Sequence, residues 1–379
     1  MQPSADDIRN SPAGPAETTC ANYVVSDTKC HGRQLPAPPL RRRRLGRPFP
    51  GFAIAAALLL AVSVVAGCSG GDSSSSASSA APSATRIPIP HETAGLAATA
   101  ADGRGAIRPL PALAGCTATV SDPVAVRDAL SKVSPGDRVC ITGDLGSYRL
   151  KIIYSGTEQA PIHVVGDGNT RVNGIEINAA NVVVDGFTVL NARSPEVEIE
   201  GNNVTLQNTV ARNPVSPGYD SLYFFGNNVK ILHNTFGHDA GDTAAQPNCM
   251  ETFSTDLGST PSHHVLIDSN RCENTTNNCL QAFGPHARGG TGRGETADLT
   301  FNNNYCQTQG SVAVTLDDVQ NATITNNVVE RVNHAWALRN NSTGAKIAGN
   351  TIAPGTPYEV GMDDSSKVGY QGPPAGGTP

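Results

Sequence analysis

Three segments, "NVKILHNTF" (228–236), "HVLIDSNRC" (264–272) and "DLTFNNNYC" (298–306), share one pattern. Each alternates apolar residues with other residues, and then has an Asn, one further residue and an apolar residue. The same pattern returns in "NATITNNVV" (321–329) and "GAKIAGNTI" (344–352). Alternation with a period of two is typical of β-strands, and its regular return along the chain favours stacked coils over a sandwich.

One Asn from each segment falls in a single column of this repeat. Successive members of the column are 36, 34, 23 and 23 residues apart. Side-chain amides stacked in this way can bond to each other between coils and can satisfy backbone groups at a bend. We therefore expect a structural role for the column: Asn234, Asn270, Asn304, Asn327 and Asn350.

A second set of strands lies between these segments. It reads "SLYFF" (221–225), "CMETF" (249–253), "CLQAF" (279–283), "SVAVT" (311–315) and "AWALR" (335–339). Nine of the ten residues at the second and fourth positions are apolar, so these positions are predicted to face the core. The first, third and fifth positions are predicted to face outward.

Together these repeats resemble the right-handed parallel β-helix superfamily typified by pectate lyases. The resemblance covers about residues 140–355 and rests on the V-x-I-x-x-N repeats. It implies an all-β solenoid, which we assign to residues 115–360, with an asparagine ladder. Asp122 as N-cap and Pro123 at the first helical position predict a short helix that caps the N-terminal end of the core. Residues 361–379 are expected to be a disordered tail.

The N-terminal region has the organisation of an export signal. An arginine-rich stretch precedes a short apolar run that ends in "VAGC". This ending resembles a bacterial lipobox, which implies lipidation of Cys68 after removal of a signal at 41–67; an ordinary signal with an incidental Cys is the alternative. Residues 68–114 are rich in Ser, Gly, Ala and Pro and are interpreted as a flexible tether. Residues 1–40 are interpreted as a disordered extension or a start assigned too early.

The charge distribution restricts the partners. The whole chain has a formal charge of −6, but residues 69–379 contain 19 Lys+Arg and 29 Asp+Glu and so carry −10. An acidic body argues against nucleic acid. We expect a monomer that binds a polysaccharide and is attached to the extracytoplasmic side of the cell membrane by the lipid, or is secreted.

Six cysteines follow Cys68. In an exported protein they are expected to form disulfides, and a zinc site is less favoured because the columns lack a CxxC. Residues stacked on neighbouring coils have Cα atoms near 5 Å apart, within disulfide range. The predicted pairs are Cys116–Cys140, Cys249–Cys279 facing outward and Cys272–Cys306 facing inward.

The outward columns hold the candidate site. One contains Tyr223, Glu251, Gln281, Ala313 and Ala337, and the next contains Phe225, Phe253, Phe283, Thr315 and Arg339. Long connections beside them add acids, imidazoles and guanidinium groups, a composition suited to proton transfer next to an anionic sugar. An alternative is that the Phe residues only pack under these loops. The candidate substrate-binding residues are Tyr223, Phe225, Phe253, Gln281, Phe283, His286 and Arg339, and the candidate catalytic residues are Glu251, Asp239, Asp242, Asp256 and Arg288.

Three functional hypotheses follow. A uronate lyase would use Arg288 or Arg293 as the base and a cation to neutralise the sugar carboxylate. Ca²⁺ is a candidate cofactor if Asp239, Asp242, Glu251 and Asp256 supply oxygens. A glycoside hydrolase would pair Glu251 with Asp242 or Asp256. A non-catalytic carbohydrate-binding or cell-envelope interaction module would need only the aromatic face. The His263–His264 pair is a weak metal signal, because neighbouring residues on a strand should face opposite ways.

Overall fold

The computed structural model describes residues 113–379 except 216–219, 240–246, 255–259, 311 and 331. The predicted N-terminal extension, the predicted export signal, Cys68 and nearly all of the predicted tether lie outside the described residues. Within the described ranges, no helix is long and apolar enough to cross a membrane.

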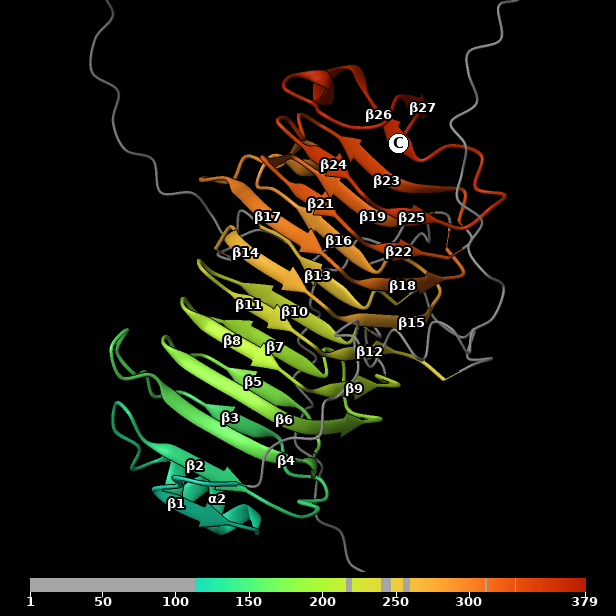
Figure 1. The fold of residues 1–379 in the computed structure, drawn as a ribbon. Coiled ribbons are helices and arrows are strands. Elements are labelled where there is room, and N and C mark those ends of the chain that lie inside the picture. The colour runs from blue at the N-terminus through green and yellow to red at the C-terminus, as the bar shows by residue number, and fades with distance from the viewer. Residues whose placement is uncertain (1–112, 216–219, 240–246, 255–259, 311, 331) are drawn as a thin grey trace, which may run out of the picture. The chain divides into compact units, whose positions relative to one another are not determined.

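Each coil contributes strands to three faces, which are visible as three stacks in Figure 1. In the described part of the chain the strands form a 17-stranded and a ten-stranded sheet, and neighbours from successive coils pair in parallel. The 17-stranded sheet bends and supplies two faces. The first face consists of β1 (Ala118–Val120), β2 (Arg138–Ile141), β4 (Ile162–Val172), β6 (Val182–Leu190), β8 (Val204–Gln207), β11 (Lys230–Leu232), β14 (His263–Asp268), β17 (Thr296–Asn302), β20 (Val319–Gln320), β21 (Thr323–Thr325) and β24 (Lys346–Ala348).

The second face of that sheet contains the continuations of β4 and β6 and six short strands. These are β9 (Val210–Arg212), β12 (Thr235–Gly237), β15 (Arg271–Thr275), β18 (Tyr305–Thr308), β22 (Val328–Val329) and β25 (Thr351–Ile352). The third face is the ten-stranded sheet of β3 (Leu150–Ile152), β5 (Ile175–Ile177), β7 (Val197–Glu200), β10 (Leu222–Phe225), β13 (Met250–Thr252), β16 (Leu280–Phe283), β19 (Val312–Asp317), β23 (His334–Arg339), β26 (Val360–Met362) and β27 (Ala375–Gly377).

The bend between the first two faces is made by the predicted Asn column. The residue before a ladder Asn adopts a left-handed backbone, as at Ser269 with φ 58° and Asn303 with φ 54°. The buried Asn270 amide then donates to Ile231 O at 2.7 Å and to Asn304 Oδ1 at 3.1 Å. Equivalent bonds recur along the column, so the structural role predicted for Asn234, Asn270, Asn304, Asn327 and Asn350 is confirmed.

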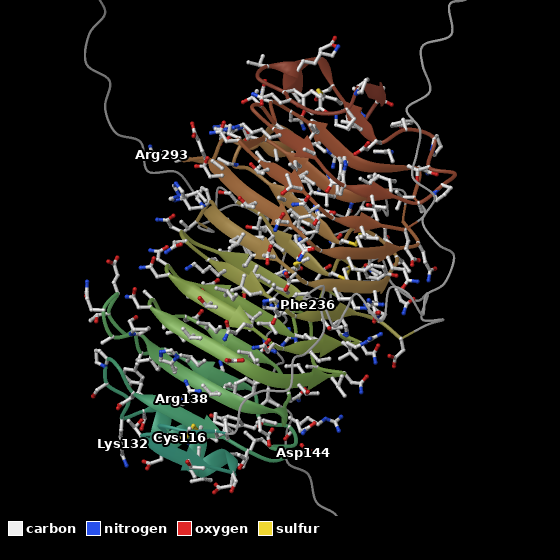
Figure 2. All side chains as sticks on the ribbon, in the orientation of Figure 1. Cys116, Lys132, Arg138, Asp144, Phe236 and Arg293 are labelled. Atoms are coloured by element: carbon white, nitrogen blue, oxygen red, sulfur yellow. A yellow bond between two sulfur atoms is a disulfide. The ribbon has the colours of Figure 1, made fainter. Side chains whose placement is uncertain are left out.

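The core is a continuous apolar filling between the three faces. Phe236, labelled in Figure 2, and Trp336 are both fully buried in it. At the β1–β2 end, helix α2 (Pro123–Leu130) begins at Asp122, whose side chain accepts from the Val124 and Ala125 amides. The helix contributes Val126 and Leu130 to the core, and its capping role stays a prediction.

The disulfide pairing differs from the predicted one in two of three cases. Cys116–Cys140 is confirmed, but the other bonds are Cys249–Cys272 and Cys279–Cys306. The two predicted columns do exist: Cys272 pairs in register with Cys306, and Cys279 stacks on Cys249. Cys249 and Cys279 are fully buried, so they face inward rather than outward.

Strand geometry explains this outcome. In register on parallel strands, stacked residues have parallel Cα–Cβ bonds, so their Cβ atoms stay about 4.8 Å apart. A disulfide needs a Cβ–Cβ separation of about 3.5–4.5 Å. Cysteines that approach from different faces across a corner of the core can meet this requirement. The observed pairs join the second and third faces in this way, with Cα–Cα distances of 5.9 and 6.0 Å.

The register of one predicted strand is shifted by two residues. Gln281 pairs with Thr315 and Phe283 pairs with Asp317, so Ala313 and Thr315 do not occupy the expected columns. A shift of two preserves the face on which each side chain lies, which is why the inward and outward pattern still matched.

The C-terminal segment also differs from its prediction. Residues 361–379 are ordered rather than disordered: they complete β26, form a short 3-10 helix at Asp364–Lys367 and add β27. Asp363 caps the 3-10 helix by accepting from the Ser366 amide at 3.0 Å. Gly- and Pro-rich composition alone did not predict that this segment extends the ten-stranded sheet.

Candidate functional site

The outer surface of the ten-stranded sheet carries a column of polar side chains. Tyr223, Glu251, Gln281 and Thr315 are register partners on β10, β13, β16 and β19. Parallel pairing in register spaces such side chains about 4.8 Å apart. The structure therefore brings together the predicted residues Tyr223, Glu251 and Gln281 on one face.

Glu251 belongs to a hydrogen-bonded group with Asp220. The Asn248 side-chain amide donates to Glu251 Oε2 at 3.1 Å, and the Asn248 backbone N–H donates to Asp220 Oδ1 at 2.6 Å. Tyr223 Oη–H donates to Asp220 Oδ2 at 2.9 Å. Asp220 is only 4% exposed, so its carboxyl depends on these donors rather than on water.

The environment disfavours negative charge on both carboxyls. Burial, reinforced by the neighbouring Asp220, raises the pKa of Glu251 to about 8, although Asn248 and Arg288 oppose the shift. Burial raises the pKa of Asp220 to about 6, against the hydrogen bonds from Asn248 and Tyr223. The direction of both shifts favours a pair that shares one proton near neutral pH. A carboxyl that stays protonated near neutral pH can act as a general acid.

Aromatic rings border this group. The Phe253 ring lies edge-on to Tyr223, with centroids 5.4 Å apart, and to Phe225 at 4.9 Å. Phe225 and Phe283 are buried, with 5% and 6% exposure, while Phe253 is partly exposed. Phe225 and Phe283 are therefore better described as residues that pack under the connecting loops than as sugar-binding residues.

The connection after β16 supplies the basic groups. The Arg288 guanidinium lies 4.2 Å from the centroid of the Phe283 ring, and it is near enough to Glu251 to influence its pKa. His286 Nδ1 lies 3.2 Å from Asp318 Oδ2. Arg339 pairs with the buried Asp317 at 2.9 Å, so its charge is already balanced.

The other predicted acids are not gathered at Glu251. Asp239 accepts from Asn213 at 2.8 Å and lies 3.6 Å from Arg212, so its contacts are with the 17-stranded sheet. Asp242 and Asp256 lie outside the described residues. Within the described ranges, no cluster of three or more His, Cys, Asp or Glu side chains has a metal-binding arrangement. The calcium hypothesis stays a prediction.

Sequence reasoning missed Asp220, Asn248 and Asn278. The Asn278 N–H donates to Asn248 Oδ1 at 3.1 Å, and the Asn278 amide donates to Thr315 Oγ1 at 3.0 Å. These residues form a second side-chain ladder immediately before the third face. The signal was present in the repeated Asn-Cys pairs at 248–249 and 278–279: the Asn is the ladder residue and the Cys is the inward disulfide residue.

A cavity of about 440 Å³ lies farther along the same sheet, toward β3. Lys151, Glu176 and Glu198 continue the outward column that contains Tyr223. Arg149 and Arg193 also line the cavity, so it holds three cations and two carboxylates. From Glu251 to Lys151 there are four strand steps, or about 19 Å.

Comparisons with known proteins agree on the fold. Residues 173–352 match the family model described as "Right handed beta helix region". A search of curated proteins found no significant sequence match. Among solved structures, an alginate lyase of family PL6, AlyGC, matches with 18% identity and a TM-score of 0.52, over 62% of this chain and 34% of the lyase.

Two further structures are similar at lower scores. An alginate lyase from Paenibacillus sp. strain FPU-7 has 16% identity and a TM-score of 0.45, over 68% of this chain and 99% of that one. Pectate lyase Pel9A has 12% identity and a TM-score of 0.42, over 68% and 79%. The chain spans about a third of AlyGC, and at this identity the likeness concerns the fold alone. The family model and the likeness to AlyGC support a right-handed β-helix fold.

Proposed function

Starting from a right-handed β-helix scaffold, we propose that the protein cleaves an acidic polysaccharide on the outer face of the ten-stranded sheet. The observation that carries the proposal is the arrangement of two carboxyls: Glu251 and the buried Asp220 both accept hydrogen bonds from Asn248, and burial raises the pKa of each. Both a lyase and a hydrolase must deliver a proton to the leaving glycosidic oxygen. In the proposal Glu251 supplies that proton, and Asp220 and Asn248 hold the Glu251 carboxyl in place. A base takes up the C5 proton in a lyase reaction, whereas water adds to the anomeric carbon in a hydrolase reaction.

Substrate recognition in the proposal rests on the neighbours of Glu251. Arg288 pairs with a uronate carboxylate, Gln281 bonds to hydroxyl groups, and the exposed edge of Phe253 packs against a sugar ring. The charged cavity toward Lys151 lies four strand steps, or about 19 Å, away on the same face. A long anionic chain could then contact both ends of the column, which supports a polymer over a small sugar as substrate.

The proposed location is extracytoplasmic. It is supported by the arginine-rich and apolar segments before Cys68 and by three disulfides, which suit an oxidising compartment. Attachment through an acyl chain on Cys68 is part of the proposal, and so is a monomeric state. The alternative function is a non-catalytic module that retains the glycan without cleaving it.

A substrate panel tests this proposal. The full chain is incubated with uronic-acid polymers and, as a control, with neutral glucans of similar length. Unsaturated products that absorb in the ultraviolet indicate a lyase, and new reducing ends without them indicate a hydrolase. Retardation in an affinity gel with no cleavage of any polymer would instead support the binding module.

The pH dependence of turnover is a second expected result. Because Glu251 must be protonated and Asp220 ionised, the rate should be bell-shaped, with limbs near the pKa values of about 6 and about 8. Asp220→Asn should remove the acidic limb. It should also move the alkaline limb to lower pH, because the Asp220 charge helps to raise the pKa of Glu251. If the rate instead increases as the pH rises through about 8 and stays high above it, Glu251 acts as a base.

A further inference from the structure

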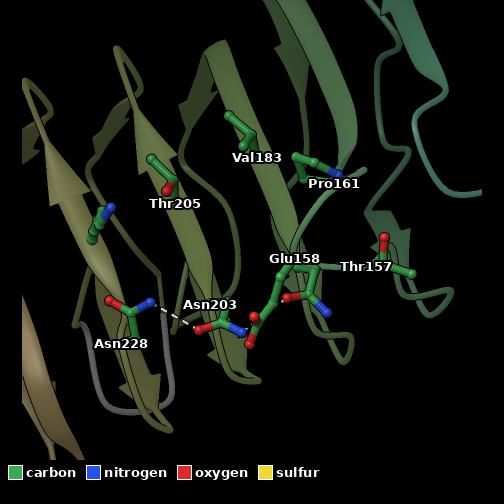
Figure 3. A pocket seen from close by; sticks show the side chains of 9 residues that line it. Thr157, Glu158, Pro161, Val183, Asn203, Thr205 and Asn228 are labelled. Atoms are coloured by element: carbon green, nitrogen blue, oxygen red, sulfur yellow. Dashed lines mark hydrogen bonds between the residues drawn. The ribbon is translucent and has the colours of Figure 1, made fainter.

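A separate row of asparagines, distinct from both ladders described above, runs along the outside of the 17-stranded sheet. The Asn203 amide donates to Asn181 Oδ1, and the Asn228 amide donates to Asn203 Oδ1, each at 2.8 Å. Figure 3 shows the Asn203–Asn228 bond at the edge of a cavity of about 370 Å³. All three residues have a left-handed backbone, with φ between 55° and 57°, which Asn tolerates better than most residues.

The next two coils place His264 and Asp298 in this row. Lys230 pairs with Leu266, which stacks His264 on Asn228; His263 pairs with Ala297, which stacks Asp298 on His264. Both residues keep the left-handed backbone of the row, with φ 54° and 56°. An imidazole and a carboxylate thus occupy positions that other coils fill with amides. A backbone position that favours Asn has no structural need for His.

The left-handed turn also changes the direction of the His264 side chain. Neighbouring strand residues normally face opposite ways, and this was our expectation for His263 and His264. Instead, the two Nδ1 atoms lie 3.1 Å apart. Asn227 Oδ1 lies 3.1 Å from His264 Nδ1 as well, because Asn227 bridges to His263 on the neighbouring coil.

Two atoms that carry lone pairs, His263 Nδ1 and Asn227 Oδ1, therefore each lie 3.1 Å from His264 Nδ1. A single imidazole N–H on His264 cannot be shared well between His263 Nδ1 and Asn227 Oδ1. A single metal ion can instead accept a lone pair from each of His263 Nδ1, His264 Nδ1 and Asn227 Oδ1. Two nitrogens bound to one Zn²⁺ at 2.0–2.1 Å in tetrahedral geometry lie about 3.3 Å apart, close to the observed separation.

The far side of the His264 ring supports the same conclusion. His264 Nε2 lies 3.6 Å from Asp298 Oδ2, which is the neighbouring member of the row. This distance is too long for a hydrogen bond, but a carboxylate near the second nitrogen of a histidine ligand favours the tautomer that has its N–H on that side. The arrangement leaves Nδ1, rather than Nε2, as the atom that binds.

We propose that His263 Nδ1, His264 Nδ1 and Asn227 Oδ1 form a site for a divalent transition-metal ion such as Zn²⁺, with water at the remaining positions and Asp298 orienting His264. Imidazole ligands suit Zn²⁺, Ni²⁺ and Cu²⁺ better than Ca²⁺ or Mg²⁺. The site is on the 17-stranded sheet, so it is separate from the Glu251 group and does not depend on the proposed function.

Titration of the full chain with Zn²⁺, followed by calorimetry, tests the site. The informative variants are His264→Asn and Asp298→Asn, since Asn is the residue that this backbone position carries in other coils and both should fold. His264→Asn is expected to weaken Zn²⁺ binding at least about 30-fold, and Asp298→Asn about tenfold. Replacement of His163, a half-buried histidine on β4, by Gln is the matched control and should leave the affinity unchanged.

A substitution of Co²⁺ for Zn²⁺ gives a second readout. Visible absorption of the bound Co²⁺ should disappear in His264→Asn and persist in His163→Gln. The proposal is overturned if the full chain shows no saturable Zn²⁺ binding, or if His264→Asn binds Zn²⁺ as tightly as the natural chain does.

Discussion

Replacement of Glu251 by Gln is expected to lower the rate of acidic-polysaccharide cleavage at least about 100-fold. Gln has the same shape and can still accept from the Asn248 amide, but it has no proton to give to the leaving oxygen. Because substrate contacts are kept, KM should change little while kcat falls. The measurement is steady-state cleavage at pH 7 of the polymer found in the substrate panel.

The matched control is Glu200→Gln on β7. Glu200 is an exposed carboxylate on the same sheet, in register with Phe225 rather than with Glu251, and its removal should leave kcat within about twofold. A Glu251→Gln variant that cleaves at the rate of the natural chain would contradict the assigned role.

The stability of the Glu251→Gln variant distinguishes loss of chemistry from loss of fold. The raised pKa of Glu251 means that the folded chain binds an extra proton between the ordinary value of 4.5 and about 8. The stabilisation of the fold by the neutral Glu251 carboxyl is fully present below pH 4.5, and it is lost as the pH rises through about 8. Thermal unfolding at pH 9 should therefore occur at a higher temperature in the variant than in the natural chain.

Replacement of Asn270 by Ala is expected to lower the free energy of unfolding by about 3–5 kcal/mol. Its buried amide donates to Ile231 O, and its Oδ1 accepts from both the backbone and the side chain of Asn234. Alanine leaves these groups buried without partners, and each such loss costs about 1–3 kcal/mol. Urea unfolding followed by circular dichroism measures the change.

The control for Asn270 is Asn203→Gly in the outer row, because Gly adopts the left-handed backbone of Asn203 without strain. Asn203 lies at the edge of an open cavity, so water can replace its side-chain bonds to Asn181 and Asn228, and the expected loss is about 1 kcal/mol or less. Equal losses for the two variants would mean that the inner ladder is no more important than the outer row.

The repeats determined most of the architecture. The apolar alternation before each ladder Asn predicted the parallel coils, the Asn column and the inward faces of β13 and β16, because strand period and burial are local consequences of residue type. The Glu251–Gln281 neighbour pair followed from the same alignment. The two-residue shift at β19 escaped prediction because it leaves every side chain on the expected face.

The tertiary structure alone decided which groups meet across coils and faces. Asp220 reaches Glu251 through Asn248, which lies 28 residues farther along the chain, and no periodic pattern marks that contact. Cys249 pairs with Cys272 rather than with the stacked Cys279, because the bond requires side chains that point toward each other. Repetition along the chain determines which coil a residue belongs to. The direction of its side chain at a corner depends on backbone angles that only the folded coil defines.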